Sequence, residues 1–187
     1  MISRRSLISG AAAAAFAAPA VLRAHTAEPF VLAEQFQPRE VRVREQHAPG
    51  QILVFPRNFY LYHVFAPERA IRYGVGVGKA GLEFKGTAII ARKAEWPSWR
   101  PTNDMIRRDP GRYAQFADGV PGGPGNPLGA RALYLYKDGR DTYFRIHGTT
   151  EPNSIGRSVS NGCIRMLNEH VMQLYDKVAV GTLVTVL

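Results

Sequence analysis

The single cysteine of the chain, Cys163, follows a glycine in the segment Ser160-Asn161-Gly162-Cys163. A thiolate is a strong nucleophile, but a free thiol has a pKa of about 8.5 and is mostly protonated at neutral pH. It therefore needs a base within hydrogen-bond reach, and an imidazole can serve. His147 ends a predicted strand, and fifteen residues lie between it and Cys163, enough for a loop that brings the two side chains together. This pair predicts nucleophilic catalysis through a covalent intermediate on sulfur.

Gly162 permits a tight turn at the thiol, so that backbone N–H groups can converge on an oxyanion. The same pattern fits a buried structural cysteine equally well, because free cysteines are among the most buried residues. A single cysteine excludes an intramolecular disulfide and a zinc site built on cysteine pairs. The residues alone leave Cys163 as either a nucleophile or an inert core residue.

Two other chemistries are disfavoured by spacing. The five histidines show no H-x-x-x-H or similar ligand spacing, so no metal is expected. Residues 76–81, Gly-Val-Gly-Lys-Ala-Gly, match the dinucleotide-binding pattern G-x-G-x-x-G. They lead into another predicted strand rather than a phosphate-binding helix, so we interpret them as a hairpin turn and predict no cofactor.

Residues 1–24 have the parts of a signal peptide, with paired arginines, an apolar run and small residues at the end. Ser3-Arg4-Arg5 resembles a twin-arginine export motif, and Sec export is the alternative. The apolar run from Leu7 to Ala18 is shorter than the ~20 residues that span a bilayer, so we expect cleavage and no stable membrane span. The mature chain is then expected in the periplasm or cell wall, where oxidising conditions make an idle thiol a liability.

The composition fits one globular domain with an extension. The chain has 187 residues, of which 45% are hydrophobic and 21% charged. We expect a polar lead-in over residues 25–50 and one domain over residues 51–187. The net charge of +9 fits an anionic polymer, an anionic surface or nucleic acid, and charge alone does not choose among them.

The elements that must position His147 and Cys163 are mostly strands. Apolar, β-branched and aromatic runs bounded by turn residues predict strands over residues 51–55, 59–65, 70–77, 86–96, 132–136, 142–146 and 183–187. One helix is predicted to begin at an N-cap, Asn168, and to end before Gly181, because an apolar stripe recurs at helical spacing from Val171. The predicted fold class is mainly β with one prominent helix.

A long segment interrupts this pattern. Residues 97–130 show little regular periodicity, and eight of the eleven residues from Gly119 to Gly129 are Gly or Pro. Insertions of this length in compact domains are often binding loops. We expect residues 103–129 to cover a substrate groove, and a passive insertion is the alternative.

The segment from His147 to Met166, which contains Ser-Asn-Gly-Cys-Ile-Arg, resembles the L,D-transpeptidase (YkuD-type) catalytic domain. Shorter stretches at residues 60–62, 96, 123–129 and 174–184 extend the resemblance, so that it covers residues 51–187. It implies a β-sandwich-like catalytic fold.

The resemblance also implies a cysteine-dependent acyltransferase that acts on peptidoglycan stem peptides. Cys163 would attack the diaminopimelate carbonyl of a donor tetrapeptide, release the terminal D-alanine and hold the acyl group as a thioester. The amine of a second stem would then form a 3→3 cross-link. A lipoprotein lysine is another acceptor, and water as acceptor would make the enzyme an L,D-carboxypeptidase or endopeptidase. By the same resemblance His147 is the base, the Gly148 carbonyl orients it, and the N–H groups of Gly162 and Cys163 form the oxyanion hole.

Five residues are expected to contact the stem peptide by this resemblance. They are Arg165, Asn161, Thr149, Ser160 and Trp96. For Arg165 two roles stay open, to hold a substrate carboxylate through its planar guanidinium or to fix the local turn. The family's usual motif has histidine where this chain has Asn161, and asparagine carries no charge near neutral pH. We therefore expect substrate alignment or acceptor choice to differ, and a non-catalytic wall-binding module is the alternative from another class. No nucleic-acid partner is implied, and the oligomeric state stays open.

Overall fold

The computed structural model describes residues 30–44 and 46–187. The predicted signal peptide over residues 1–24 and the start of the lead-in lie outside the described residues. None of the helices in the described part of the chain has the length and apolar character needed to cross a membrane.

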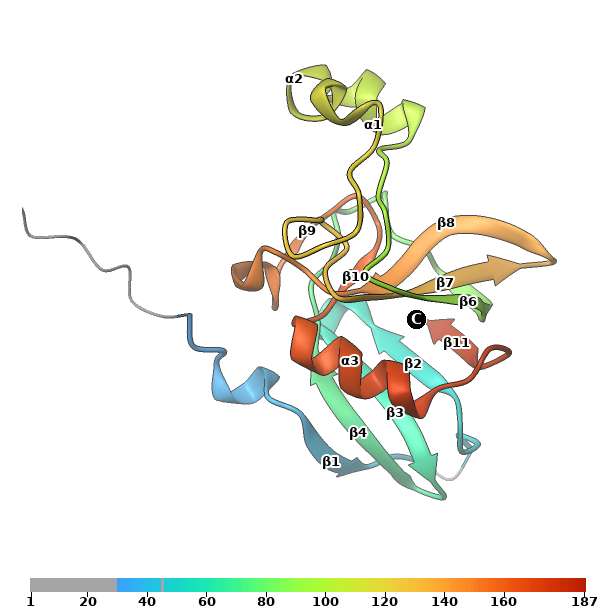
Figure 1. The fold of residues 1–187 in the computed structure, drawn as a ribbon. Helices are drawn as coiled ribbons and strands as arrows, with labels where there is room; N and C mark the ends of the chain where they lie inside the picture. Colours follow the sequence, from blue (N-terminus) through green and yellow to red (C-terminus); the bar gives the residue numbers. More distant parts are fainter. Residues whose placement is uncertain (1–29, 45) are drawn as a thin grey trace, which may run out of the picture.

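A mixed sheet of nine strands forms the body of the described chain (Figure 1). In spatial order the strands are β1 (Arg39–Arg42), β4 (Arg69–Gly74), β3 (Tyr60–Ala66), β2 (Ile52–Phe55), β11 (Leu183–Val186), β6 (Gly86–Glu95), β7 (Arg131–Lys137), β8 (Arg140–His147) and β10 (Ile164–Arg165). Most neighbours are antiparallel, but β11 runs parallel to β2, and β10 runs parallel to β8. Two short strands, β5 (Val77–Gly78) and β9 (Ser158–Ser160), pair in parallel as a second small sheet.

The large sheet bends around helix α3 (Asn168–Lys177), with β3 and β4 extending below the helix and β6, β7 and β8 above it in Figure 1. The main core draws side chains from both halves of the sheet and from α3, among them Leu61, Leu133 and Leu174, each with no exposed surface. Burying such a leucine contributes about 2 kcal/mol to folding. The prediction of a mainly β fold with one prominent helix is confirmed, and the two packed halves give it the expected sandwich-like form.

Helix α3 begins where the sequence predicts, but for a different reason. Its N-cap is Leu167, not Asn168, and no side chain caps it. The Asn168 Oδ1 atom instead accepts hydrogen bonds from the backbone of Ala130 at 3.0 Å and of Thr149 at 3.2 Å. The N-cap prediction was wrong because these distant amides, which follow directly on the Gly129 turn and on His147-Gly148, compete for the same oxygen. Asn168 therefore fixes the backbone just after His147.

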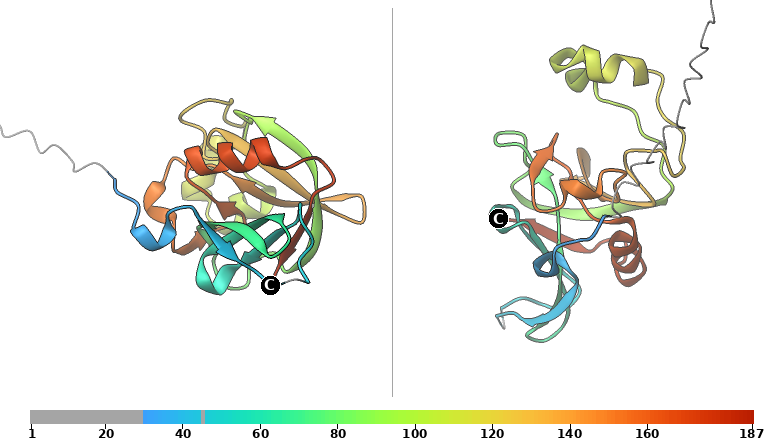
Figure 2. Two further views of the ribbon diagram at one scale, coloured as in Figure 1. Left: turned by 90° about the horizontal axis from the view of Figure 1, so that it is seen from below. Right: turned by 90° about the vertical axis from the view of Figure 1, so that its left-hand side faces the viewer.

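The segment predicted to lack regular structure contains two short helices and a 3-10 turn: α1 (Asn103–Arg108), α2 (Pro110–Tyr113) and η3 (Ala114–Phe116). The Thr102 hydroxyl caps α1 by accepting from the Met105 N–H at 3.2 Å, and the Asp109 carboxylate caps α2 by accepting from the Arg112 N–H at 3.1 Å. We call residues 102–116 the roof segment, since it stands out from the sheet in Figure 1 and overhangs it in the right-hand view of Figure 2. The remaining 3-10 turns are η1 (Glu34–Phe36), η2 (Pro56–Asn58) and η4 (Pro152–Ser154).

Candidate active site

A cleft of about 1100 Å³ lies between the roof segment and the ends of β8, β9 and β10. Six of the residues predicted for the site line this cleft: His147, Thr149, Ser160, Asn161, Cys163 and Arg165. Side chains from the roof segment, including Arg108, Arg112 and Tyr113, line the opposite side. The expected covering of a groove by residues 103–129 is thus matched by the part that forms the roof segment.

Trp96 is the predicted contact residue that does not reach the cleft. It is 43% exposed, follows β6, and its backbone N–H donates to the Ala130 carbonyl at 2.8 Å. Trp99, three residues further along, lines the cleft instead and packs edge-on against Tyr113 and Phe116 of the roof segment. The family resemblance was placed on Trp96, and nothing in the sequence showed that Trp99 would be the tryptophan in the cleft.

The parallel pairing of β8 with β10 brings the predicted base, His147, close to the loop over residues 160–163 that ends at the predicted nucleophile, Cys163. We call this loop the nucleophile loop. In this register Arg165 lies opposite His147, and Ile164 lies opposite Ile146. The Met166 N–H also donates to the His147 carbonyl at 2.8 Å. Cys163 directly precedes β10, so it emerges at the edge of the cleft that His147 also lines.

The imidazole of His147, the predicted base, is held in its neutral form. Its side chain is buried, and its Nδ1 atom lies 2.5 Å from the Gly148 carbonyl oxygen. Because a carbonyl only accepts, Nδ1 carries the proton and Nε2 is left with a free lone pair. Burial, which is the largest cause, and the Arg165 charge together lower the pKa of His147 to about 3, although the Gly148 hydrogen bond opposes them. The imidazole is therefore unprotonated at physiological pH.

The Cys163 thiol is held in its protonated form. Burial raises its pKa, while the backbone amide and the charge of Arg145 partly oppose this shift. The Sγ atom donates to the Tyr143 carbonyl oxygen at 3.8 Å. The thiol and the imidazole line the same cleft and both are neutral, so no thiolate–imidazolium ion pair is preformed there.

A bulge in β8 aims the Tyr143 carbonyl at the thiol. The register of β7 with β8 shifts between Tyr134 and Tyr136, and Tyr143 has a φ of 61°, which is unfavourable for a residue with a side chain. Asp141 holds this backbone in place: it accepts from the Tyr143 N–H at 2.8 Å and from two Arg145 nitrogens at 2.7 and 2.8 Å. Neither the bulge nor this bidentate clamp was predicted from the sequence.

Gly162 makes the turn that precedes the nucleophile. Its φ is 120°, and a Cβ atom there would collide with the Phe144 ring and the Leu82 carbonyl. Its N–H, predicted to serve an oxyanion, donates to the Ser160 Oγ atom at 3.1 Å, while that hydroxyl donates to the Cys163 carbonyl at 2.6 Å. The Ser160 hydroxyl therefore holds the loop in place through two hydrogen bonds. The Gly162 N–H would have to leave this hydroxyl, or share its hydrogen bond with it, in order to bind an oxyanion.

The glycine-rich segment at residues 76–81 supports the same loop. Gly76 exchanges backbone hydrogen bonds with Arg165, and the Lys79 N–H donates to the Ser160 carbonyl at 3.0 Å. A Cβ atom on Gly78 would lie 2.7 Å from the Gly162 Cα atom. The interpretation as a hairpin turn was wrong, because the flanking strands β4 and β6 are not neighbours in the sheet and β5 pairs with β9 instead. The glycine at position 78 allows close backbone packing beneath the nucleophile loop. The chain continues through a turn to β6, with no helix after the segment.

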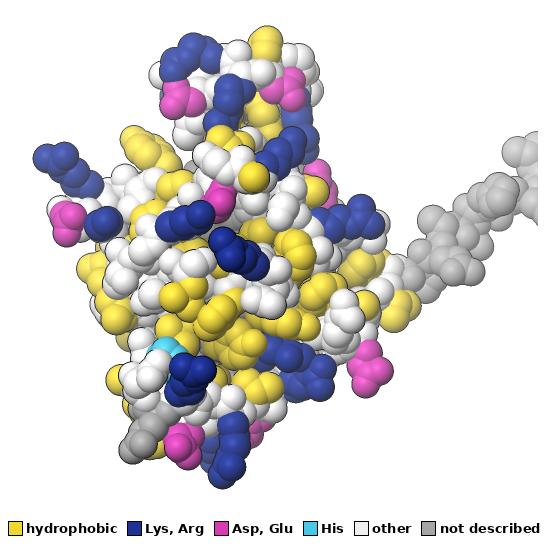
Figure 3. All heavy atoms as spheres, turned by 180° about the vertical axis from the view of Figure 1, so that it is seen from behind, with side chains coloured by type: hydrophobic (Ala, Val, Ile, Leu, Met, Phe, Trp, Pro, Cys, Tyr) yellow, Lys and Arg dark blue, Asp and Glu magenta, His cyan; other side chains and the backbone are white. Residues whose placement is uncertain are grey.

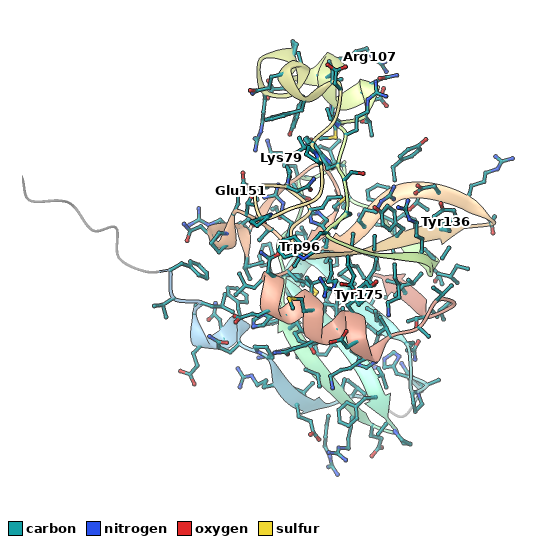
Figure 4. All side chains as sticks on the ribbon, viewed as in Figure 1. Lys79, Trp96, Arg107, Tyr136, Glu151 and Tyr175 are labelled. Atoms are coloured by element: carbon teal, nitrogen blue, oxygen red, sulfur yellow. The ribbon has the colours of Figure 1, made fainter. Side chains whose placement is uncertain are left out.

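Polar contacts join both sides of the nucleophile loop to the roof segment. Asn161 donates from Nδ2 to the Tyr113 hydroxyl at 2.6 Å. Glu151 pairs with Arg165 on the floor of the cleft and, at 3.6 Å, with Arg112 in the roof segment. Figure 4 shows Glu151 between the roof segment and the body of the protein. Glu151 was not predicted, and its position in a loop after His147 carries no motif that would have revealed it.

The neutral forms of Cys163 and His147 predict how the reactivity of the thiol changes with pH. The rate at which iodoacetamide alkylates Cys163 is expected to rise continuously through about pH 9, because the thiol pKa lies above its ordinary value of about 8.5. The alkylation rate is expected to show no step near pH 6.5, the ordinary pKa of a histidine, because the pKa of His147 is lowered to about 3. Alkylation followed by mass spectrometry measures this profile. A plateau below about pH 7 would instead indicate a thiolate–imidazolium pair.

Comparison with known proteins identifies the domain. The sequence model of the YkuD family, described as the L,D-transpeptidase catalytic domain, matches residues 49–186. The probable L,D-transpeptidase ErfK/SrfK of Escherichia coli (strain K12) is 38% identical over 117 residues, which are 62% of this chain and 36% of that protein. The chain thus spans about a third of the length of this curated relative. The resemblance to the family is confirmed.

Solved structures agree on the fold. A Brucella melitensis protein named a probable carnitine operon oxidoreductase is 52% identical, with a TM-score of 0.57 over 81% of this chain and 93% of that chain. An L,D-transpeptidase of Enterococcus faecium is 17% identical, with a TM-score of 0.53 over 75% of this chain and 50% of that chain, and supports the fold alone.

Proposed function

The chain belongs to the L,D-transpeptidase catalytic domain family, and from this premise we propose that it is a cysteine-dependent acyltransferase that forms 3→3 cross-links between peptidoglycan stem peptides. The observation that carries the proposal is the buried His147, oriented by the Gly148 carbonyl in the same cleft as the only thiol of the chain. We also propose export to the periplasm or cell wall, by the route that residues 1–24 suggest.

In the first half-reaction, His147 Nε2 takes the proton of the Cys163 thiol as sulfur attacks the diaminopimelate carbonyl of a donor tetrapeptide. A carbon–sulfur bond forms, and negative charge collects on the carbonyl oxygen, where the Cys163 N–H and a released Gly162 N–H would stabilise it. When the intermediate collapses, the amide carbon–nitrogen bond breaks. The imidazolium of His147 gives its proton to the departing D-alanine amine, which leaves a thioester.

In the second half-reaction, the amine of a second stem peptide attacks the thioester carbonyl. His147 removes a proton from this amine, the carbon–sulfur bond breaks, and the thiol is regenerated. Water in place of the amine would yield a tripeptide instead of a cross-link, and a lipoprotein lysine would yield an anchored lipoprotein. All three outcomes share the thioester, so the fate of that intermediate defines the activity.

The experiment that tests the proposal is incubation of the purified protein with disaccharide tetrapeptides from peptidoglycan, followed by mass spectrometry of the products. We expect dimers that carry a 3→3 link together with released D-alanine. Tripeptides without dimers would replace transferase by L,D-carboxypeptidase activity. Unchanged tetrapeptides and no mass increase on the protein would support a non-catalytic wall-binding module.

A further inference from the structure

The arginines along the cleft are not equivalent. Arg145 is paired with Asp141 through a bidentate contact, and Arg165 is paired with Glu151. Arg112 shares Glu151 at 3.6 Å. The deep positive charges of the cleft therefore have partners within the protein.

The remaining cations lie toward the roof segment. Arg100 and Arg108 line the cleft and take part in no ion pair with another described residue. The acidic side chains nearby are engaged elsewhere, Asp104 with Arg107 and Glu83 with Lys85. Seen from behind, the roof segment carries basic side chains with acidic side chains among them (Figure 3). The cleft thus carries excess positive charge on its roof side.

Arg108 is also held in a defined place. Its Nη2 atom donates to the Asn161 Oδ1 atom at 3.4 Å. The Asn161 amide is in turn oriented by its 2.6 Å hydrogen bond from Nδ2 to the Tyr113 hydroxyl, which turns the amide oxygen toward Arg108. Asn161 stands two residues before Cys163, so the guanidinium lies beside the nucleophile loop. Its other N–H groups are available for a bidentate contact with a carboxylate.

We propose that Arg108, held by Asn161, binds a free carboxylate of the stem peptide next to the bond that Cys163 attacks. This rests on the proposed function, in which the donor carries two such groups: the terminal D-alanine carboxylate and the second carboxylate of diaminopimelate. The proposal also gives Asn161 a role, which is to hold the Arg108 guanidinium in place. A neutral amide offers an oxygen to the guanidinium at every pH, whereas a histidine there would repel Arg108 once protonated.

A test that does not depend on stem peptides uses two small alkylating agents. Iodoacetate and iodoacetamide differ by a carboxylate, so the ratio of their rates with Cys163 reports a carboxylate site beside the thiol. The Arg108→Gln variant is expected to lower the iodoacetate to iodoacetamide ratio by about tenfold. The control is Arg107→Gln, which removes the same charge from the same helix at a residue that pairs with Asp104 and lies outside the cleft lining (Figure 4).

An unchanged ratio in Arg108→Gln, or an equal fall in Arg107→Gln, would overturn the inference whatever the muropeptide assay gives. Three synthetic donors then distinguish the two carboxylates: the free tetrapeptide, its terminal amide, and the peptide amidated on diaminopimelate. The amide that removes the bound carboxylate should lower wild-type kcat/KM for thioester formation about tenfold and have little effect in Arg108→Gln. Equal wild-type rates for all three donors would overturn the inference. If no donor forms a thioester, the proposed function fails, while the alkylation ratio still decides whether the carboxylate site exists.

Discussion

Replacement of Cys163 by alanine is expected to abolish the covalent acyl-enzyme, with a loss of thioester formation of at least about a thousandfold. The chain has no second thiol that could substitute. Cys163→Ser should lose nearly as much, because a hydroxyl is a weaker nucleophile and the neighbouring imidazole, with a pKa of about 3, is too weak a base to compensate. Intact-protein mass spectrometry after incubation with a donor tetrapeptide measures both losses.

The fold should survive this substitution, which makes the result interpretable. Cys163 precedes β10 and is only partly buried, so removal of its sulfur leaves the main core unchanged. Circular dichroism and thermal unfolding of Cys163→Ala should match the wild type within a few degrees. A peptide adduct that still forms on Cys163→Ala, or that maps to another residue, would defeat the assignment.

The raised thiol pKa has a second consequence, which concerns the proposed location outside the cytoplasm. Oxidation of a cysteine proceeds through its thiolate. The raised pKa of Cys163 keeps its thiolate fraction small at neutral pH. We therefore expect this thiol to oxidise slowly at the proposed location.

The residue types made Cys163 and His147 candidates, because one thiol, an imidazole at loop distance and a glycine before the thiol can be recognised in the sequence. They did not distinguish a nucleophile from a buried structural cysteine, and the catalytic roles came from the family resemblance. The strands and α3 could be predicted because apolar residues recur at regular spacing along them. The pairing of β8 with β10 places Arg165 opposite His147. Nothing in either segment of the sequence indicates that the two strands pair, so this contact could be found only in the structure.

The features that escaped prediction are short or depend on distant partners. Helices α1 and α2, of six and four residues, are too brief to show periodicity, although Thr102 and Asp109-Pro110 mark their starts. Asn168 has the residue type of an N-cap, yet two amides from other loops use its side chain. The bulge at Tyr143 is defined by a shift in the register of β8 against β7, so the sequence of β8 alone does not predict it. Tertiary contacts override the local preference in each of these places.

Replacement of His147 by glutamine is expected to lower the rate of thioester formation by about 10² to 10⁴, the usual contribution of a positioned base. Glutamine can still donate a hydrogen bond toward the Gly148 carbonyl and fill most of the space, but it has no lone pair that accepts a proton at neutral pH. The loss should be in the chemical step, so single-turnover acylation is the measurement to make. The alkylation of Cys163 by iodoacetamide should fall less, because at high pH hydroxide replaces the missing base.

The matched control for this loss is His170→Gln. His170 is as buried as His147, its pKa is likewise lowered by burial, and it lies on α3 against Tyr73 rather than in the cleft. Substitution there removes an imidazole from the interior without touching Cys163, so it should change the free energy of unfolding but leave acylation within about twofold of wild type. Equal losses of acylation in the two variants would show that His147 acts through packing. A loss confined to His147→Gln would assign the proton transfer to its Nε2 atom, the one ring nitrogen that the Gly148 carbonyl leaves free.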